Sequence, residues 1–265
     1  MQADPENLLR PQSFVRKPAL LVPLLVPLLL ASTALVQFAI FWRGVHKARA
    51  LAAQGRRYER RLASKGLSKG LAVLILGDST GVGVGASLPE ESIAGLLAAD
   101  LPDADVVNIS ESGARVADAI AQAKKCNDAG LHFDVAILHL GGNDIVKATP
   151  TDKLAAGCEE LMTELEKLAH RTVWLGPPNL GIAPLFPAPY SWLLAARSRA
   201  AAAVFAQSAA RHQVSFIDFS APAHAGHFQG GGRQHFAVDG FHPNSASYRY
   251  GYAAARQAMG LAPKS

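Results

Sequence analysis

Two short stretches of the sequence hold the residue types that acyl-transfer chemistry requires. The first contains Ser79, in the small-residue turn Gly77-Asp-Ser-Thr-Gly81 that follows the apolar run Leu71–Leu76. A buried strand that enters a tight turn and then a helix exposes a serine hydroxyl beside backbone N–H groups. Gly-Asp-Ser is also ordinary turn chemistry. This stretch alone therefore leaves a nucleophile and a plain turn as equal alternatives.

The second stretch is Asp239-Gly-Phe-His-Pro243. Of the nine histidines, His242 is the best candidate for a general base, because Asp239 precedes it by three residues and Pro243 restricts the backbone after it. Within one tight turn, the carboxylate can accept from Nδ1–H while Nε2 faces a serine. Acyl transfer also requires donors for the oxyanion. The Ser79 N–H, the Gly113 N–H and the Asn143 side-chain amide are the candidates.

The elements that must position these residues alternate along the chain. Apolar runs predict strands over residues 71–76, 105–109, 133–140, 172–175 and 214–219. Helices are predicted between and after them, over residues 87–101 with Ser87 as the N-cap, 114–126, 150–170, through an Ala-rich segment to 212, and after Pro243. Regular alternation with near-continuous apolar strands indicates an α/β fold, with a parallel sheet covered by helices on both faces. Cys126 and Cys158 fall on predicted helices and are expected to be buried thiols.

Functional groups in such a sheet gather at the carboxyl ends of the strands. This rule places Ser79, Ser110–Gly113, Gly141–Asp144 and Pro177–Asn179 along one edge. Asp239 and His242 can reach the same edge from the loop before the last helix.

Four of these segments resemble the conserved blocks of the SGNH hydrolase superfamily, the GDSL-type esterases and lipases. The blocks are Gly77-Asp-Ser79, Gly113, Gly142-Asn-Asp144 and Asp239-x-x-His242, and the resemblance covers about Leu71 to Leu261. It implies a flavodoxin-like three-layer α/β/α fold and a catalytic triad of Ser79, His242 and Asp239. The implied oxyanion hole uses Ser79, Gly113 and Asn143, and the implied activity is hydrolysis of carboxylic esters through an acyl-enzyme, with no metal or other cofactor.

The sequence departs from the family pattern at two positions. Thr80 stands where Leu or Ile is commoner, and Glu111 stands where the second block usually has Asn. The second departure concerns the hydrogen bonding around Gly113. Asp144, which follows the oxyanion asparagine, is predicted to cap the next turn or to anchor the loop.

Other interpretations of the same motifs account for less of the chain. Gly77-x-Ser79-x-Gly81 matches the nucleophile elbow of α/β-hydrolases, but that fold places the elbow after several strands. Gly81-x-Gly83-x-x-Ala86 resembles a dinucleotide fingerprint, yet it begins several residues after the strand. His224, His227 and His235 lack regular ligand spacing, which favours loop histidines at the substrate mouth over a metal site.

The N-terminal region differs in composition from the rest. No charged residue occurs from Pro18 to Trp42, a stretch long enough to span a bilayer core of about 30 Å. An uncleaved membrane anchor is favoured, with a signal peptide that ends near Ser32-Thr-Ala34 and a buried core helix as the alternatives. Lys and Arg counts place the C-terminal side in the cytoplasm, with an outward-facing (periplasmic or secreted) domain as the alternative.

The net charge of +5 is concentrated in a basic run between Arg43 and Lys69. No aromatic residues interleave with it in a base-stacking pattern, which argues against nucleic acid. The predicted interpretation is an amphipathic helix over residues 44–65 that lies against anionic lipid.

The predicted organisation is an N-terminal tail (1–17), a transmembrane segment (18–42), a basic juxtamembrane linker (43–70) and a hydrolase domain (71–265). The predicted function is a membrane-anchored serine esterase that acts on small or lipid-like esters. A carbohydrate O-deacetylase or a thioesterase on the same fold is the alternative, and a non-catalytic membrane-tethered binding module is the alternative from another class. No protein partner is inferred.

Overall fold

The computed structural model describes residues 22–61, 70–229 and 232–261. The chain divides into two compact units, residues 1–40 and 41–265. Helix α1 (Val22–Gln54) runs through the boundary, and in the first unit its residues 30–40 are exposed. No helix in the described residues is both long enough and apolar enough to cross a bilayer, so the transmembrane segment predicted over residues 18–42 is not supported. The predicted tail over residues 1–17 lies outside the described residues, as do residues 18–21.

The second unit is built on a parallel sheet, as predicted. Its strands are β1 (Ala72–Gly77), β2 (Asp105–Asn108), β3 (Phe133–His139), β4 (Ala169–Leu175) and β5 (Ser215–Ile217), in the order β2-β1-β3-β4-β5. This is the flavodoxin-like order, and it reverses between β1 and β3. Gly77 pairs with His139, so β1 and β3 end at the same level of the sheet.

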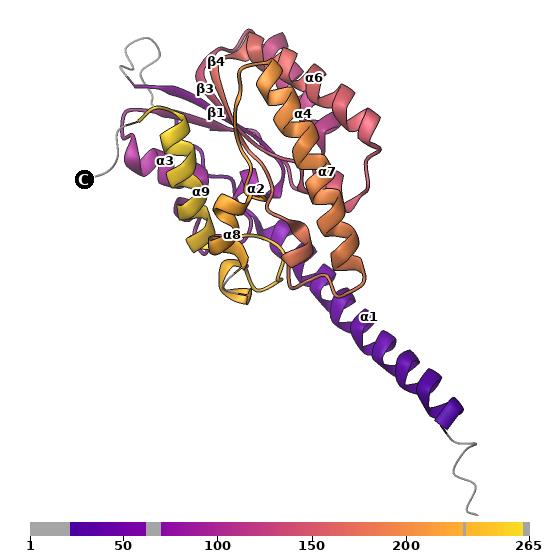
Figure 1. Ribbon diagram of the computed structural model, residues 1–265. Coiled ribbons are helices and arrows are strands. Elements are labelled where there is room, and N and C mark those ends of the chain that lie inside the picture. The colour runs from indigo at the N-terminus through magenta and orange to yellow at the C-terminus, as the bar shows by residue number, and fades with distance from the viewer. Residues whose placement is uncertain (1–21, 62–69, 230–231, 262–265) are drawn as a thin grey trace, which may run out of the picture. The chain divides into compact units, whose positions relative to one another are not determined.

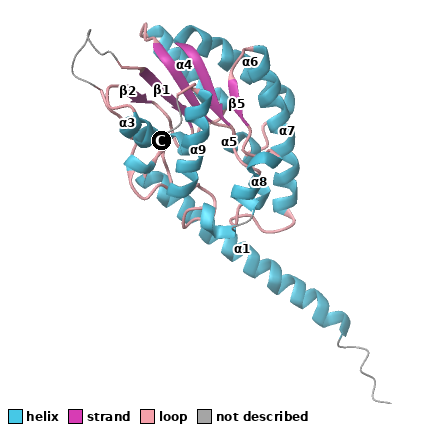
Figure 2. Ribbon diagram, turned by 60° about the vertical axis from the view of Figure 1, so that its left-hand side comes forward, coloured by secondary structure: helices cyan, strands magenta, loops and turns pink. Residues whose placement is uncertain are grey.

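Helices cover both faces of the sheet and give three layers (Figure 2). Alternate strand residues face opposite sides, so Leu74 and Leu76 of β1 pack under α4 (Val116–Asp128), α6 (Thr151–Leu168) and α7 (Tyr190–Arg211). Val73 and Ile75 pack under α3 (Ile93–Asp100) and α9 (Ser245–Ala258). Both cysteines are buried and free, as predicted.

Short elements complete the unit. They are α2 (Ser79–Val82), α5 (Gly142–Val146), α8 (Pro222–Gln229), η2 (Pro89–Glu91), η3 (Leu180–Ile182) and η4 (Gly232–His235). Element η2 corrects one prediction, because it separates Ser87 from the helix that follows. The N-cap of α3 is Ser92, whose Oγ accepts from the Gly95 N–H, while the Ser87 N–H donates to Ser245 Oγ.

The predicted amphipathic helix over residues 44–65 is too long, because α1 ends at Gln54. The chain then pairs with the open edge of β2. The Arg60 N–H donates to the Val106 carbonyl over 3.0 Å, and the Val106 N–H donates back over 2.7 Å. The Arg60 guanidinium also donates to carbonyls at the end of α3, including those of Ala98 and Leu101. The last carbonyls of a helix lack intrahelical donors, and an arginine there complements the helix dipole.

Candidate active site

The Ser79 turn is shaped by the end of β1. Gly77 has φ of +137°, and a Cβ at this position would lie 2.0 Å from the His139 carbonyl oxygen, so only glycine fits. Ser79 then begins α2. Asp78 caps this helix, because its Oδ1 accepts from the Thr80 N–H over 2.8 Å and from Thr80 Oγ1 over 2.5 Å. Thr80, a departure from the family pattern, therefore adds a hydrogen bond to the cap.

His242 and Asp239 meet Ser79 from the loop before α9. His242 Nε2 lies 2.9 Å from Ser79 Oγ, and His242 Nδ1 lies 2.5 Å from Asp239 Oδ2. The other carboxylate oxygen of Asp239 accepts from the backbone N–H groups of Phe241 and His242. All three side chains are buried. The structure thus brings together the three residues that the sequence pattern selects.

The carboxylates in this site differ in their protonation chemistry. Burial acts to raise the pKa of Asp239, but the hydrogen bond from His242, its charge and the two backbone N–H groups outweigh burial and hold that pKa below its ordinary value. Burial raises the pKa of Asp78 to about 6, although hydrogen bonds from Thr80 oppose the rise. Asp239 is therefore the anionic partner of the histidine near neutral pH.

The predicted oxyanion donors lie on neighbouring loops. Gly113 has φ of +88°, and within the described part of the chain its N–H donates to no protein acceptor. Asn143 donates one Nδ2 hydrogen to the Ala114 carbonyl over 3.0 Å, which leaves the second hydrogen for a ligand. Glu111, the other departure, supports the Gly113 turn through its backbone, since its N–H donates to the Gly77 carbonyl over 2.9 Å and its carbonyl accepts from Ala114.

Hydrogen bonds from α5 join these two loops. Asp144 is buried, and its Oδ2 accepts from the Val116 N–H over 3.0 Å while its Oδ1 accepts from Thr149 Oγ1 over 2.8 Å. Lys147 Nζ donates to the Gly113 carbonyl over 3.1 Å. Asp144 therefore anchors the loop, as predicted, and holds it against the start of α4.

The geometry is accompanied by a family match over most of the second unit. Residues 75–250 match the GDSL-like Lipase/Acylhydrolase family. The chain belongs to this family. Ser79, Gly113, Asn143, Asp239 and His242 all lie within the matched residues, and the predicted SGNH/GDSL membership and ester-hydrolase activity are confirmed.

Solved structures agree with the family assignment at the level of fold. An alpha/beta hydrolase enzyme, LAE5, from the metagenome of Lake Arreo, Spain, is 21% identical, covers 75% of this chain and 99% of its own, and has a TM-score of 0.59. Axe2, an acetylxylan esterase from Geobacillus stearothermophilus, is 20% identical, with 75% and 98% coverage and a TM-score of 0.57. TesA is 21% identical, with 71% and 97% coverage and a TM-score of 0.56. No curated protein matches the chain.

Several polar residues that support the GDSL motifs escape sequence reasoning. Gln122 on α4 pairs with both backbone groups of Gly77, and buried Asn108 at the end of β2 donates to the Gly81 carbonyl over 2.9 Å. Tyr248 on α9 donates from its hydroxyl to the Val84 carbonyl over 2.8 Å. A polar residue at the carboxyl end of a strand is a usable signal for Asn108, whereas Gln122 and Tyr248 resemble other helix residues.

A cavity of about 70 Å³ opens beside Ser79 and has a mostly apolar lining. Its polar lining residues include Ser79, Asn143 and His242. Its apolar members come from both faces of the sheet: Ile93, Leu140, Pro177, Pro178, Leu180, Phe219, Phe236, Phe241 and Tyr248. His139 also lines the cavity, and burial lowers its pKa to about 4, so its imidazole is neutral.

The prediction that His224, His227 and His235 lie in a loop is wrong, because His224 and His227 lie on α8 and His235 ends η4. His235 lines the cavity, in agreement with a place at the substrate mouth. His227 stacks on Tyr250 with ring centroids 3.8 Å apart, and His224 Nδ1 lies 2.7 Å from the Tyr250 hydroxyl. No group of side chains suited to hold a metal ion occurs in the described residues.

Proposed function

We propose that this ester hydrolase is a serine esterase that works through an acyl-enzyme on Ser79. The observation that carries the proposal is the hydrogen-bonded chain from Asp239 through His242 to Ser79, which ends at an apolar cavity. In the first step, Ser79 Oγ attacks the ester carbonyl while its proton moves to His242 Nε2. Asp239 keeps Nδ1 protonated and stabilises the imidazolium that forms.

The negative charge of the tetrahedral intermediate falls on the former carbonyl oxygen. The Ser79 N–H, the Gly113 N–H and the second hydrogen of Asn143 Nδ2 are the donors that stabilise this oxyanion. Because hydrogen bonds between α5 and the Gly113 turn set the two loops in advance, little reorganisation accompanies the reaction.

Collapse of the intermediate breaks the bond from the carbonyl carbon to the alcohol oxygen. His242 Nε2 returns its proton to that oxygen, and the alcohol leaves. Water then attacks the acyl-enzyme, its proton passes to Nε2, and Ser79 Oγ departs and regains the proton as the carboxylic acid is released.

The cavity favours aliphatic acyl groups. Gly251 of α9 contributes to its wall, and a Cβ there would lie 3.6 Å from Ile93 Cδ1 and 3.7 Å from Phe219 Cζ. An apolar wall stabilises a methylene chain by about 0.8 kcal/mol for each buried CH₂. An apolar wall provides few hydrogen-bond partners for the hydroxyl groups of a sugar. Carbohydrate O-deacetylation is therefore the second candidate, favoured only by the similarity to an acetylxylan esterase.

A fluorophosphonate probe tests the nucleophile in the full-length protein. We expect covalent labelling of the wild type and none of Ser79→Ala. Ser247→Ala is the matched control, because this serine lines the same cavity but donates to the His235 carbonyl. Labelling of Ser79→Ala, or a folded wild type without label, would contradict the proposal.

The substrate class is tested by measuring kcat/KM for esters of one alcohol with acyl chains from acetyl to decanoyl. An acetylated xylooligosaccharide and a thioester are measured in the same series. We expect kcat/KM to rise with chain length beyond acetyl. A preference for the acetylated sugar would assign the second candidate instead.

A further inference from the structure

The part of α1 that belongs to the second unit has one face turned toward the hydrolase fold. Half-buried residues recur on it at helical spacing: Phe41, Gly44, Val45, Ala48, Leu51 and Ala52. Arg43, Lys47 and Arg49 are exposed between them. An apolar stripe with this period packs against protein. The face also precedes the family match, which begins at residue 75.

One end of this face contacts the segment that carries the acid and the base. Gly44 leaves no room for a side chain, since a Cβ there would lie 2.2 Å from Leu185 Cδ1 and 3.9 Å from the Asp239 carbonyl oxygen. Leu185 in turn donates its N–H to the Gly240 carbonyl over 3.0 Å. The helix therefore lies beside the Asp239 turn and is linked to it through Leu185.

Aromatic rings continue this contact as far as His242. The ring of Phe41 lies 6.3 Å from that of Phe186, which lies 5.5 Å from that of Phe241. The Phe241 ring lies 5.0 Å from the imidazole of His242. The rings form a packed row from the helix to the candidate base, and packed aromatic rows resist displacement because each ring fills the space beside the next.

The other end of the face lies against the residues that follow Ser79. Gly55, just after the helix, lies so close to the Ser79 turn that a Cβ would be 3.1 Å from Val82 Cγ1 and 2.9 Å from Val84 Cγ2. The Val84 N–H donates to the Ser79 carbonyl over 2.9 Å. Arg57 Nη1 adds a bond of 3.3 Å to the Ser110 carbonyl, near the Gly113 turn. Figure 1 shows this part of α1 between α2 and the start of α7.

We propose that this packed face of residues 41–57, which we call the brace, positions the Ser79 turn against the Asp239–His242 turn. The proposal rests on the esterase mechanism, which needs Nε2 of His242 within hydrogen-bond reach of Ser79 Oγ. About 15 Å of helix separates Gly44 from the end of α1 at Gln54. A rigid element of that length sets the distance between two loops that come from opposite ends of the hydrolase domain. The brace residues touch no reacting atom, so they are positioning residues.

The first test compares two valine substitutions in the full-length protein. Gly44→Val pushes against Leu185 and the Asp239 turn, whereas Ala50→Val adds the same side chain on the exposed face of the same helix. A misplacement of 1 Å can cost about 100-fold in rate. We expect kcat, normalised to sites titrated with fluorophosphonate, to fall by about 10-fold in Gly44→Val, with KM within twofold and Ala50→Val unchanged. Wild-type kcat in Gly44→Val, or an equal loss in Ala50→Val, overturns the proposal.

Two further variants distinguish a displaced Asp239 turn from a general folding defect in Gly44→Val. Adding Leu185→Ala to Gly44→Val removes the overlapping side chain, and kcat should recover severalfold relative to Gly44→Val alone. Phe41→Ala creates no overlap and should lower kcat by about threefold to 10-fold with a melting temperature near that of the wild type. No recovery in the double variant together with wild-type kcat in Phe41→Ala overturns the proposal.

Hydrogen exchange separates failure of the brace from failure of the esterase mechanism. Amides of residues 82–84 and 240–242 should exchange faster in Gly44→Val than in the wild type or Ala50→Val, whether or not the protein turns over an ester. Absence of fluorophosphonate labelling in the wild type and in every variant would reject the esterase mechanism. Unchanged exchange in Gly44→Val would reject the brace.

Discussion

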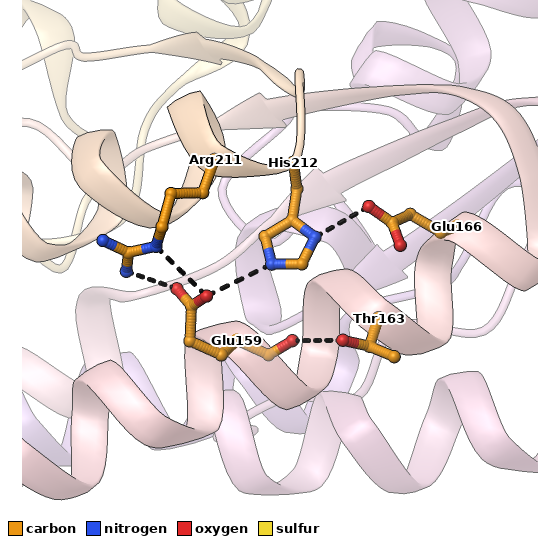
Figure 3. Close-up of polar contacts among 5 residues, drawn as sticks. All are labelled: Glu159, Thr163, Glu166, Arg211 and His212. Atoms are coloured by element: carbon orange, nitrogen blue, oxygen red, sulfur yellow. Dashed lines mark hydrogen bonds and ion pairs between the residues drawn. The ribbon is translucent and has the colours of Figure 1, made fainter.

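Two histidines of this protein contact carboxylates in very different regions. His242 is buried, with Asp239 on one ring nitrogen and Ser79 on the other. His212, at the end of α7, lies near the surface with Glu166 Oε1 2.7 Å from Nδ1 and Glu159 Oε2 3.2 Å from Nε2. Figure 3 shows this surface cluster, in which Arg211 also donates to Glu159.

The difference shows that a histidine–carboxylate pair is not by itself a catalytic unit. Both ring nitrogens of His212 face carboxylates, and the hydrogen bond to Glu166 is the largest cause that raises its pKa above the ordinary value, against the effect of burial. His212 ties α6 to α7, and neither of its ring nitrogens faces a hydroxyl that it could deprotonate. His242 differs, because its Nδ1 faces the Asp239 carboxylate while its Nε2 faces the Ser79 hydroxyl.

The largest expected effect separates the two histidines directly. His242→Gln should lower kcat by about 10⁴-fold to 10⁶-fold, because the base and nucleophile act as a unit. His212→Gln should leave kcat within twofold, since it lies outside the cavity. Steady-state kinetics on a soluble ester measures both, and comparable losses in the two variants would remove the distinction.

Replacement of the carboxylate partner of each histidine should give the second-largest difference in kcat. Asp239→Asn should lower kcat by about 10³-fold to 10⁴-fold, through loss of the correct tautomer and of imidazolium stabilisation. Glu166→Gln is the matched change at the surface and should leave kcat unaltered. The comparison fails if Asp239→Asn retains more than a tenth of wild-type kcat while its fold is intact by circular dichroism.

Loss of an oxyanion donor, a group with no counterpart in the surface cluster, should lower kcat by less than loss of the triad residues. Asn143→Ala should lower kcat by about 10²-fold to 10³-fold with little change in KM, the usual result for one lost oxyanion donor. Initial rates over a range of ester concentrations separate the two constants. A rise in KM alone would assign Asn143 to ground-state binding instead.

The smallest effect concerns stability at the surface cluster. Because the pKa of His212 is raised in the folded protein, its ion pairs contribute fully below the unfolded pKa of about 6.5 and are lost as pH rises through the folded value. The contribution of such exposed pairs is about 0.2–1 kcal/mol. The melting temperature of His212→Gln should therefore lie below that of the wild type by about 1–3 °C at pH 6. The gap should narrow toward pH 9, and a gap that widens with pH would show that the pairing has the opposite sign.

Much of the fold and of the candidate site can be predicted because the signals are local. A run of apolar residues that ends in Gly77-Asp-Ser79 predicts strand, turn and serine, and Asp239 lies three residues from His242, so a single turn brings the carboxylate to the imidazole. Regular alternation of apolar runs and amphipathic segments predicts the parallel sheet. Its carboxyl edge then follows from the chain direction common to all strands.

The surroundings of the site were decided by tertiary structure alone. Asp144 binds the Val116 N–H 28 residues away, Gln122 binds Gly77 over a separation of 45, and Tyr248 reaches Val84 over 164. The type of a polar side chain determines which groups it can hydrogen-bond. It does not determine which residue the partner is, because that depends on how distant elements pack. The close approach of Gly44 to Leu185 and Asp239 is even harder to predict from the sequence. A glycine has no side chain whose chemistry could indicate which neighbour lies against it.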